Sequence, residues 1–381
     1  MSSLHAVLAL ATTALLGVGG PPAIPGTDPV QAALDDAVSQ AHAPGIAAEI
    51  RDGRHTWFGA AGVSNLDTGT PRTADQRVRI GSTTKAFTAT IVLQLAGEHR
   101  LRLDDPIEKY LPGVVDGNGY DGSTITVQQL LDHTSGIFSY TNYRPFFDQG
   151  TGAAWFQHRY DHYDPIDLVR IGLLTPPIAP PGQVFTYSNT DSILAAMIVE
   201  RITGHSFADE LTRRIVRPLG LTGTSLPGDD PRIHGPHPEL YSTLFVPGPN
   251  PAIHDATEMN QTFAWAAGGM ISTLGDLNRF FGALLGGRLL PPAEQRAMFR
   301  TVSTGPPGTW IDHTRYGLGI FSQTLTCGVT VWGHGGATYG SWSYVMGDRT
   351  GRHLIAISVN GDYSGLPVFN AVLDAAFCPG S

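Results

Sequence analysis

The chain has 381 residues, which is enough for one large domain or two. Its 33 acidic residues outnumber its 24 lysines and arginines, so the net charge is −9. This balance argues against nucleic acid as a partner, because nucleic-acid sites are basic. Neither the 14 histidines nor the two cysteines have the spacing of zinc ligands, and we expect no metal site and no cofactor.

The first residues are typical of a secretory signal peptide, which we place at residues 1–25. An apolar run at 6–17 is followed by small residues at 19–23. The segment before that run contains His5 but no lysine or arginine, so an apolar N-terminal helix is the alternative. Nowhere else does the sequence approach the roughly 18 apolar residues needed to cross a bilayer. We therefore expect a secreted protein without a membrane span.

The segments that follow predict a helix and then a β-hairpin. Residues Val30–Ala41 have an amphipathic helical pattern. Two strand-like runs, Gly45–Arg51 and Thr56–Gly62, stand on either side of Asp52 and Gly53, a pair typical of hairpin turns.

A serine and a lysine three residues apart begin the next predicted helix. The chain has two lysines against 22 arginines, and one of them, Lys85, follows Ser82 by three residues. A desolvated lysine can lose its proton near neutral pH, whereas an arginine cannot. The run Ala86–Ala96 predicts a buried helix, which would place both side chains on one face, with a base beside a hydroxyl nucleophile. The alternative is a surface helix start with Ser82 as its N-cap and Lys85 in solvent.

From residue 101 to 255 the chain has helical segments, loops and many prolines, with few strand signals. Strand signals then return near the C-terminus, with glycine and aspartate in the turns. The predicted strands are Leu318–Gln323, Val329–Gly333, Trp342–Met346 and Leu354–Val359, and a helix near Leu366–Phe377 closes the chain.

This order predicts an α+β fold, with an antiparallel β-sheet flanked by helices and an inserted helical domain. A doubly wound sheet is excluded because βαβ alternation is absent from the sequence. We assign residues 30–100 and 256–381 to an α/β sheet domain and residues 101–255 to the helical insertion. The active site would lie in the cleft between them, where pockets commonly form.

Two further motifs follow the Ser-x-x-Lys of residues 82–85, namely Tyr-Ser-Asn at 187–189 and His-Gly-Gly at 334–336. In this order they resemble the motif set of the penicillin-recognising serine hydrolases. That group includes D-alanyl-D-alanine peptidases, class C β-lactamases, and related esterases and D-aminopeptidases. The segments 129–136 and 265–273 also resemble this family. The C-terminal part is most similar to the secreted actinomycete D-alanyl-D-alanine carboxypeptidases, so the resemblance implies a β-lactamase/DD-peptidase-like fold.

The resemblance implies a role for each motif. Ser82 would be the nucleophile that forms an acyl-enzyme, and Lys85 and Tyr187 would be a coupled base pair that shares a proton. Asn189 would orient Lys85 and hydrogen-bond a substrate amide oxygen. His334 would donate to the Tyr187 oxygen or pass a proton, with a structural residue on an edge strand as the alternative.

Supporting groups would come from backbone and aromatic residues. The N–H groups of Ser82 and Ala337 would form the oxyanion hole, and Gly336 would let the strand approach a ligand closely. The candidate pocket walls are Trp265, Tyr143, Phe146 and Phe147. His133, after Asp132, could be mistaken for a catalytic residue, but we expect it to be a buried histidine at a helix C-terminus, with Asp132 as a cap.

An even number of cysteines in an exported chain suggests that the cysteines pair. The two in this chain, Cys327 and Cys378, therefore predict one disulfide. The bridge would join the last helix to the strand that begins near Gly328.

One departure from the similar carboxypeptidases affects specificity. Those enzymes hold the substrate's terminal carboxylate with an arginine and two hydroxyls, and here the corresponding positions are Phe321, Gly335 and Ala337. Arg315 or Arg144 would have to supply the missing charge.

We therefore expect an exported serine hydrolase that resembles a D-alanyl-D-alanine carboxypeptidase. The alternatives are an esterase or a D-aminopeptidase or amidase of the same family, and a non-catalytic β-lactam-binding sensor. The expected partner is a D-alanyl peptide, an ester or a β-lactam, and we expect a monomer.

Overall fold

The computed structural model describes residues 27–378. The predicted signal peptide at 1–25 lies outside the described residues. Within them, no helix is both long and apolar enough to cross a membrane.

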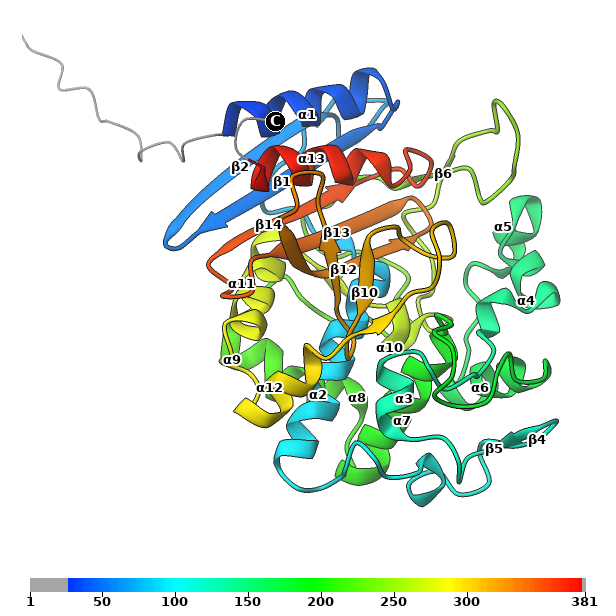
Figure 1. The fold of residues 1–381 in the computed structure, drawn as a ribbon. Coiled ribbons are helices and arrows are strands. Elements are labelled where there is room, and N and C mark those ends of the chain that lie inside the picture. Colours follow the sequence, from blue (N-terminus) through cyan, green and yellow to red (C-terminus); the bar gives the residue numbers. More distant parts are fainter. Residues whose placement is uncertain (1–26, 379–381) are drawn as a thin grey trace, which may run out of the picture.

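A large antiparallel sheet of eight strands dominates the fold (Figure 1). Its strand order is β2-β1-β14-β13-β12-β11-β10-β9. The strands are β1 (Gly45–Asp52), β2 (His55–Gly62), β9 (Val302–Ser303), β10 (Thr314–Tyr316), β11 (Phe321–Thr324), β12 (Thr330–Thr338), β13 (Ser341–Gly347) and β14 (His353–Val359). Three two-stranded ladders lie outside it: β3 (Val78–Arg79) with β8 (Ile271–Ser272), β4 (Asp116–Gly117) with β5 (Tyr120–Asp121), and β6 (Tyr241–Ser242) with β7 (His254–Asp255).

The sheet joins the two ends of the described chain. Strands β1 and β2 form the predicted hairpin, in which Asp52 faces His55 and Gly53 takes a positive φ of 58°. The other edge of β1 pairs with β14 from Ile46↔Val359 to Asp52↔His353. The predicted α+β fold with an antiparallel sheet is therefore confirmed.

Helices cover both faces of the sheet (Figure 1). The helices are α1 (Thr27–Ser39), α2 (Thr84–Gly97), α3 (Val127–Leu131), α4 (Arg144–Gln149), α5 (Trp155–His158), α6 (Pro165–Leu173), α7 (Asn189–Thr203), α8 (Phe207–Leu211), α9 (Arg217–Leu219), α10 (Trp265–Gly268), α11 (Leu274–Leu285), α12 (Pro292–Met298) and α13 (Pro367–Phe377). The first and last, α1 and α13, pack together on one face, and α11 packs on the other against β13 and β14.

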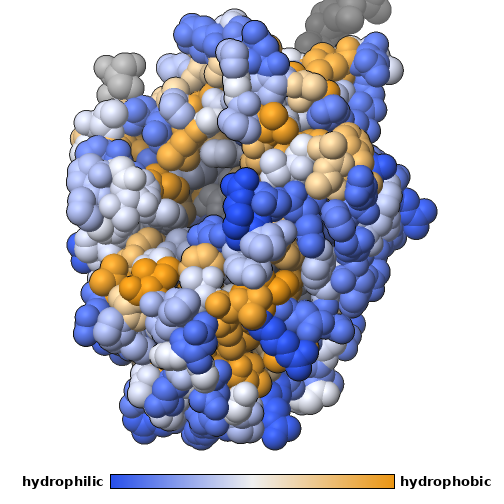
Figure 2. Space-filling model, turned by 90° about the vertical axis from the view of Figure 1, so that its right-hand side faces the viewer, coloured by the Kyte–Doolittle hydropathy of each residue, from blue (hydrophilic) through white to orange (hydrophobic). Residues whose placement is uncertain are grey.

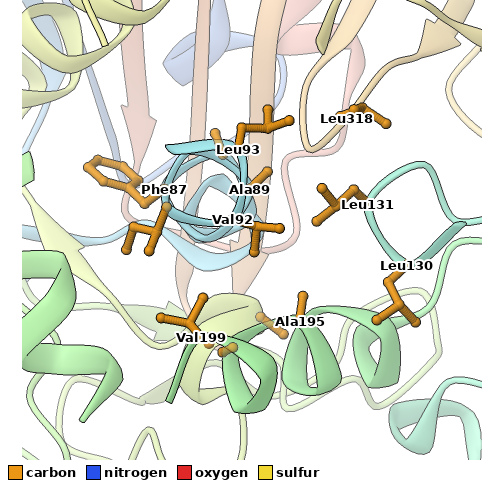
Figure 3. Close-up of a cluster of buried hydrophobic side chains, with 14 of the residues drawn as sticks. Phe87, Ala89, Val92, Leu93, Leu130, Leu131, Ala195, Val199 and Leu318 are labelled. Atoms are coloured by element: carbon orange, nitrogen blue, oxygen red, sulfur yellow. The ribbon is translucent and has the colours of Figure 1, made fainter. Parts of the chain in front are cut away.

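Helix α2 runs through the centre of the larger hydrophobic core. Its residues are mostly apolar and are buried on every side, and buried side chains surround it from α3, α7 and the segment before β11 (Figure 3). Phe87 stacks on Phe280 of α11 with ring centroids 3.6 Å apart. The helix that carries Lys85, the lysine predicted to act as a base, is therefore packed on all sides.

Three features of the C-terminal half refine the predictions. Strand β12 continues to Thr338, five residues beyond the predicted end, because its glycines keep pairing with β13 up to Thr338↔Ser341. The short strands β9 and β10 were not predicted. The predicted disulfide between Cys327 and Cys378 is confirmed, and it joins the β11–β12 turn to the end of α13.

Residues 101–255 contribute no strand to the eight-stranded sheet. They form helices α3 to α9 and the two ladders β4–β5 and β6–β7, in keeping with the proposed helical insertion. The exact division of the chain into domains stays a prediction.

Candidate active site

The Ser-x-x-Lys segment lies where the core helix meets the sheet. Ser82 stands in the 3₁₀ turn η1 (Gly81–Thr83), directly before α2. The hydroxyl of Ser343 on β13 donates to the Ile80 carbonyl at 2.8 Å and contacts the Thr83 hydroxyl at 2.9 Å. These contacts fix the turn to the central strands, so Ser82 is held on a rigid element.

Lys85 is buried beside Ser82. Its Nζ lies 3.1 Å from Ser82 Oγ, 2.6 Å from Asn189 Oδ1 and 2.7 Å from the Ala267 carbonyl oxygen. Burial lowers the pKa of Lys85 to about 7, and the Asp191 carboxyl opposes this shift. The alternative of an N-capping serine and a solvated lysine is therefore wrong.

The three oxygens around Lys85 Nζ can accept from the three N–H groups of an ammonium, and the same geometry also serves a neutral amine. A neutral amine has two N–H bonds, which can be donated to the two carbonyl oxygens of Asn189 and Ala267. Its lone pair then points at Ser82 Oγ and can accept the hydroxyl proton. The arrangement can therefore activate the serine.

Tyr187 completes the constellation. Lys85 Nζ lies 4.8 Å from the centroid of the Tyr187 ring, and the phenol lies near enough to the Ser82 hydroxyl to interact with it. Burial raises the pKa of Tyr187, and the interaction with Ser82 only partly opposes this rise. The sequence had predicted that the lysine would favour the phenolate and lead to proton sharing. The surroundings instead keep the proton on the phenol and lower the pKa of the lysine to about 7, where its neutral form is well populated.

Asn189 begins α7 and connects the lysine to the helical part. Its Oδ1 accepts from Lys85, its Nδ2 donates to Thr141 Oγ1 at 3.0 Å, and its backbone N–H donates to Ser139 Oγ at 3.0 Å. The expected orientation of Lys85 by Asn189 is present in this geometry. Thr141, which fixes the amide in turn, carries no motif signal in the sequence.

His334 on β12 contacts groups other than those expected. Its Nε2 lies 2.9 Å from the hydroxyl of Tyr316, and its Nδ1 bonds the carbonyl of Gly335. Burial lowers the pKa of His334 to about 3, with Lys85 adding to the shift, so the imidazole is neutral at pH 7. The expected partner, the Tyr187 oxygen, is therefore replaced by the phenol of Tyr316, which His334 holds in place.

The backbone of β12 approaches Ser82 as closely as glycine permits. A Cβ added to Gly336 would lie 2.5 Å from the Ser82 nitrogen, and one added to Gly81 would lie 2.6 Å from the Ala337 nitrogen. Gly81 also has a positive φ of 50°. The two N–H groups predicted for the oxyanion hole thus belong to backbone segments in direct contact.

A pocket of about 300 Å³ opens from Ser82 toward α4 and α5. It is lined by Ser82, Tyr140, Thr141, Asn142, Phe146, Phe147, Gln149, Gly150, Trp155, His158, Arg159, Asp161, Tyr163, Asn189, Phe245, Met259, Asn260, Phe263, Ala264, Ala267, Gly268, Ala337, Thr338 and Tyr339. Figure 2 shows the face that carries α4 and α5, where the surface is hollowed and hydrophobic side chains border the hollow.

The predicted pocket walls divide in two. Phe146 and Phe147 line the pocket, and Tyr143 and Trp265 are not among the lining residues. Trp265 packs edge-on against Phe207 of α8, with ring centroids 5.6 Å apart.

Two of the three positions of the missing carboxylate clamp, Phe321 and Gly335, are enclosed by aromatic rings, and Ala337 lines the pocket. Phe321 is fully buried, with its ring 5.1 Å from that of Trp310 and 5.4 Å from that of His334. A Cβ on Gly335 would lie 2.5 Å from the ring of Tyr344. Because aromatic rings occupy this space, a free carboxylate there would lose water without gaining a charged partner.

The arginine that lines the pocket is Arg159, and not Arg315 or Arg144, the two that the sequence had suggested as a source of charge. Its guanidinium lies 5.1 Å from the Trp155 ring and 4.6 Å from the Tyr160 ring. Arg315 instead donates to Thr301, and Arg144 pairs with Asp148, and neither lines the pocket.

A buried polar group behind the lysine was also missed. The fully buried Asp191 of α7 contacts His133 Nδ1 at 3.0 Å and accepts from Ser135 Oγ at 2.6 Å. His133 follows α3, is buried and has a positive φ of 58°, as the structural interpretation predicted. Asp132 caps the same turn by accepting from Thr134. Asp191 stands four residues after Tyr187, and only its burial distinguishes it from a surface residue in the first turn of a helix.

Residues 30–376 match the beta-lactamase family. The chain belongs to that family. It is a serine hydrolase of the beta-lactamase and penicillin-binding protein type, as the three motifs had predicted. Within residues 27–378, no group of three or more His, Cys, Asp or Glu side chains is placed to hold a metal ion.

Three relatives give the range of activities in this family. A D-stereospecific amidohydrolase from Streptomyces sp. superimposes with a TM-score of 0.86 at 43% identity, over 93% of this chain and 99% of that one. A D-amino acid amidase from Ochrobactrum anthropi SV3, complexed with L-phenylalanine amide, has a TM-score of 0.77 at 25% identity, over 92% and 98%. Penicillin-binding protein 4 of Amycolatopsis lactamdurans is 29% identical over 339 residues, 87% of this chain and 84% of that protein.

Proposed function

We propose that the protein is an amidohydrolase that releases a small amine from D-amino-acid amides with a hydrophobic side chain. The observation that carries this proposal is the aromatic filling around Phe321, where a carboxypeptidase would bind the carboxylate of its leaving amino acid. A leaving group without a charge, such as ammonia from a primary amide, avoids the cost of that desolvated carboxylate.

The pocket on the other side of Ser82 supports the same substrate. Its lining includes Phe146, Phe147, Phe263 and Tyr339, and aromatic side chains bury apolar groups well. A volume of about 300 Å³ is in the range of small-ligand sites. The similarity to a D-stereospecific amidohydrolase at 43% identity agrees with this choice.

The proposed reaction begins when Ser82 Oγ attacks the amide carbon and its proton moves to the neutral Lys85 Nζ. The carbonyl oxygen becomes an oxyanion that accepts from the N–H groups of Ser82 and Ala337. Tyr187, which keeps its phenolic proton and lies near Ser82, donates a proton to the departing amine, and Lys85 then restores it. Water hydrolyses the acyl-enzyme by the reverse transfers.

A D-alanyl-D-alanine carboxypeptidase is the second candidate. It is supported by the similarity to penicillin-binding protein 4 and by one observation in the pocket. Arg159 lines the cavity, and the side-chain Nε of Arg159 is buried with no hydrogen-bond partner among the described residues. In a carboxypeptidase of this kind, Arg159 would bind the carboxylate of the leaving amino acid, because Phe321 offers that carboxylate no charged partner. The exported state, which the disulfide supports, is proposed for either function.

A matched substrate set separates the two. We expect kcat/KM for D-phenylalanine amide to exceed that for D-alanyl-D-alanine at least tenfold, and the L-phenylalanine amide to react more slowly than the D form. Ser82→Ala is the control for background hydrolysis. If free D-alanyl-D-alanine is preferred tenfold over its C-terminal amide, and Arg159→Met removes that preference, the carboxypeptidase replaces the amidohydrolase as the function.

A further inference from the structure

A second concave region lies away from the catalytic pocket and is strongly basic. It has a volume of about 850 Å³ and lies between the ends of β1 and α11, helix α12 and the β13–β14 turn. We call it the arginine basin, and define it by Arg51, Arg288, Arg296, Arg349 and Arg352. Its lining contains no aspartate or glutamate among the described residues. Five of the 24 basic residues of a chain with net charge −9 therefore meet in one place.

The charges of the arginine basin are not neutralised by the protein. Within residues 27–378, the arginines that form ion pairs with carboxylates within 4.0 Å are all outside the basin. Two acidic side chains near the basin form no ion pair with it. Asp348 accepts from Thr350 and from the backbone N–H of Arg352, and burial raises the pKa of Glu49, although the charge of Arg51 partly opposes that rise.

The helix end beneath the basin does not account for the arginines. Cations are often found at helix C-termini because they satisfy the last carbonyl groups. At the end of α11, Gln295 Nε2 takes this role by donating to the carbonyls of Leu284 at 2.9 Å and Leu285 at 3.4 Å. The one side-chain bond recorded for the five arginines is that of Arg51 to the Gly53 carbonyl. The guanidinium groups therefore remain available to a ligand.

The basin has a rigid framework. A Cβ added to Gly351, whose φ is 65°, would lie 2.7 Å from the Gly282 carbonyl oxygen, so the β13–β14 turn and α11 touch backbone to backbone. The guanidinium of Arg349 lies 4.2 Å from the ring centroid of Phe299 and 5.5 Å from that of Trp332. These contacts hold at least one guanidinium in place without a counter-ion.

We propose that the arginine basin binds a linear polyanion that carries several phosphate groups. Guanidinium groups bind phosphate oxygens through two parallel hydrogen bonds, and five of them spread over about 850 Å³ exceed what one phosphate can contact. Because the net charge of the protein is −9, its overall field repels anions, and the attraction must come from this local cluster. Binding should accordingly weaken as salt concentration rises.

The basin and the active site lie near opposite ends of one strand. On β12, Ala337 faces Trp342 at the catalytic end, and Trp332, which contacts Arg349, faces Gly347 near the basin. Five residues of strand correspond to about 17 Å. Figure 1 likewise places α11 and α12 on the side of the molecule away from α4 and α5. A polymer held in the basin would leave the catalytic pocket open.

Calorimetric titration of the full-length mature enzyme with inorganic tripolyphosphate at low salt tests the proposal. We expect tripolyphosphate to bind at least tenfold more tightly than orthophosphate. Each exposed guanidinium–phosphate pair contributes about two- to fivefold, so Arg349→Gln with Arg352→Gln should weaken binding roughly tenfold. Arg288→Gln with Arg296→Gln should do the same, and neither of these two arginines has a recorded packing partner that its loss would disturb.

The matched control is Arg170→Gln with Arg232→Gln. It removes the same charge from exposed arginines that are paired with Asp167 and Asp230. We expect this control to change tripolyphosphate affinity less than twofold, and all variants to keep wild-type kcat/KM for D-phenylalanine amide. Equal weakening by the control, equal affinity for orthophosphate, or binding to phosphatidylglycerol vesicles without binding to tripolyphosphate would each overturn the proposal.

Discussion

Lys85→Met should make the free energy of unfolding of the enzyme less dependent on pH. In the folded state burial lowers the pKa of Lys85 to about 7, whereas an unfolded lysine titrates near 10.4. Between these values the unfolded state binds more protons than the folded state. The free energy of unfolding of the wild type therefore rises with pH in this window, and the cost of burying Lys85 is greatest below pH 7.

The size of the effect follows from the two pKa values. The cost is about 5 kcal/mol at pH 6 and about 2 kcal/mol at pH 9, so wild-type stability gains about 3 kcal/mol between these pH values from Lys85 alone. Methionine keeps the length of the side chain without titrating. It also leaves the oxygens of Asn189 and Ala267 without their donor, but that loss does not depend on pH.

Urea unfolding at pH 6 and pH 9 measures the difference. The control is Lys109→Met, which removes the other lysine of the chain, an exposed one whose pKa is raised by Asp105. We expect the control to follow the wild type and Lys85→Met to lack about 3 kcal/mol of the rise. Parallel curves for all three proteins would refute a depressed pKa at Lys85.

Four other outcomes are expected at the site and the disulfide. The kcat/KM for an amide should rise about tenfold per pH unit up to about pH 7 and then level off, because Lys85 must be neutral; a flat profile contradicts a lysine base. Lys85→Arg should lower kcat by about 10²- to 10⁴-fold, since the charge stays and the proton cannot leave; retention of most activity would make Lys85 only an electrostatic group. Ser82→Ala should abolish labelling by a fluorescent penicillin or fluorophosphonate, and mass spectrometry should find the wild-type adduct on Ser82 alone. Cys327→Ala with Cys378→Ala should lower stability by up to about 4 kcal/mol, as expected for the 51-residue separation, and an unchanged melting temperature argues against this.

Short-range patterns explain why much of the fold could be predicted. The hairpin at Asp52 and Gly53 and the apolar helix after Ser82 depend on local sequence, and the order of the three motifs identified the family. The hydrogen-bond partners of His334 could not be found in this way, because they depend on Tyr316 from a neighbouring part of the sheet.

Electrostatics was the least predictable part of the site. From the sequence, a lysine beside a tyrosine favours a shared proton, but enclosure by surrounding residues shifts both pKa values toward the neutral forms. Burial also determines what an arginine at the clamp position would do. Phe321 is fully buried among aromatic rings, so Phe321→Arg would place an unpaired charge in the core and would destabilise the protein before it could create a carboxylate clamp.

The pairing of β1 with β14 has a consequence for how the protein is made. Ile46 finds its partner Val359 only when 313 further residues have been synthesised, which at roughly 5 to 20 residues per second takes about 15 to 60 s. Until then the β1–β2 hairpin has an open edge and the nascent chain has no complete sheet. The eight-stranded sheet can therefore close only near the end of synthesis, when the last helix arrives together with the second cysteine that ties it in place.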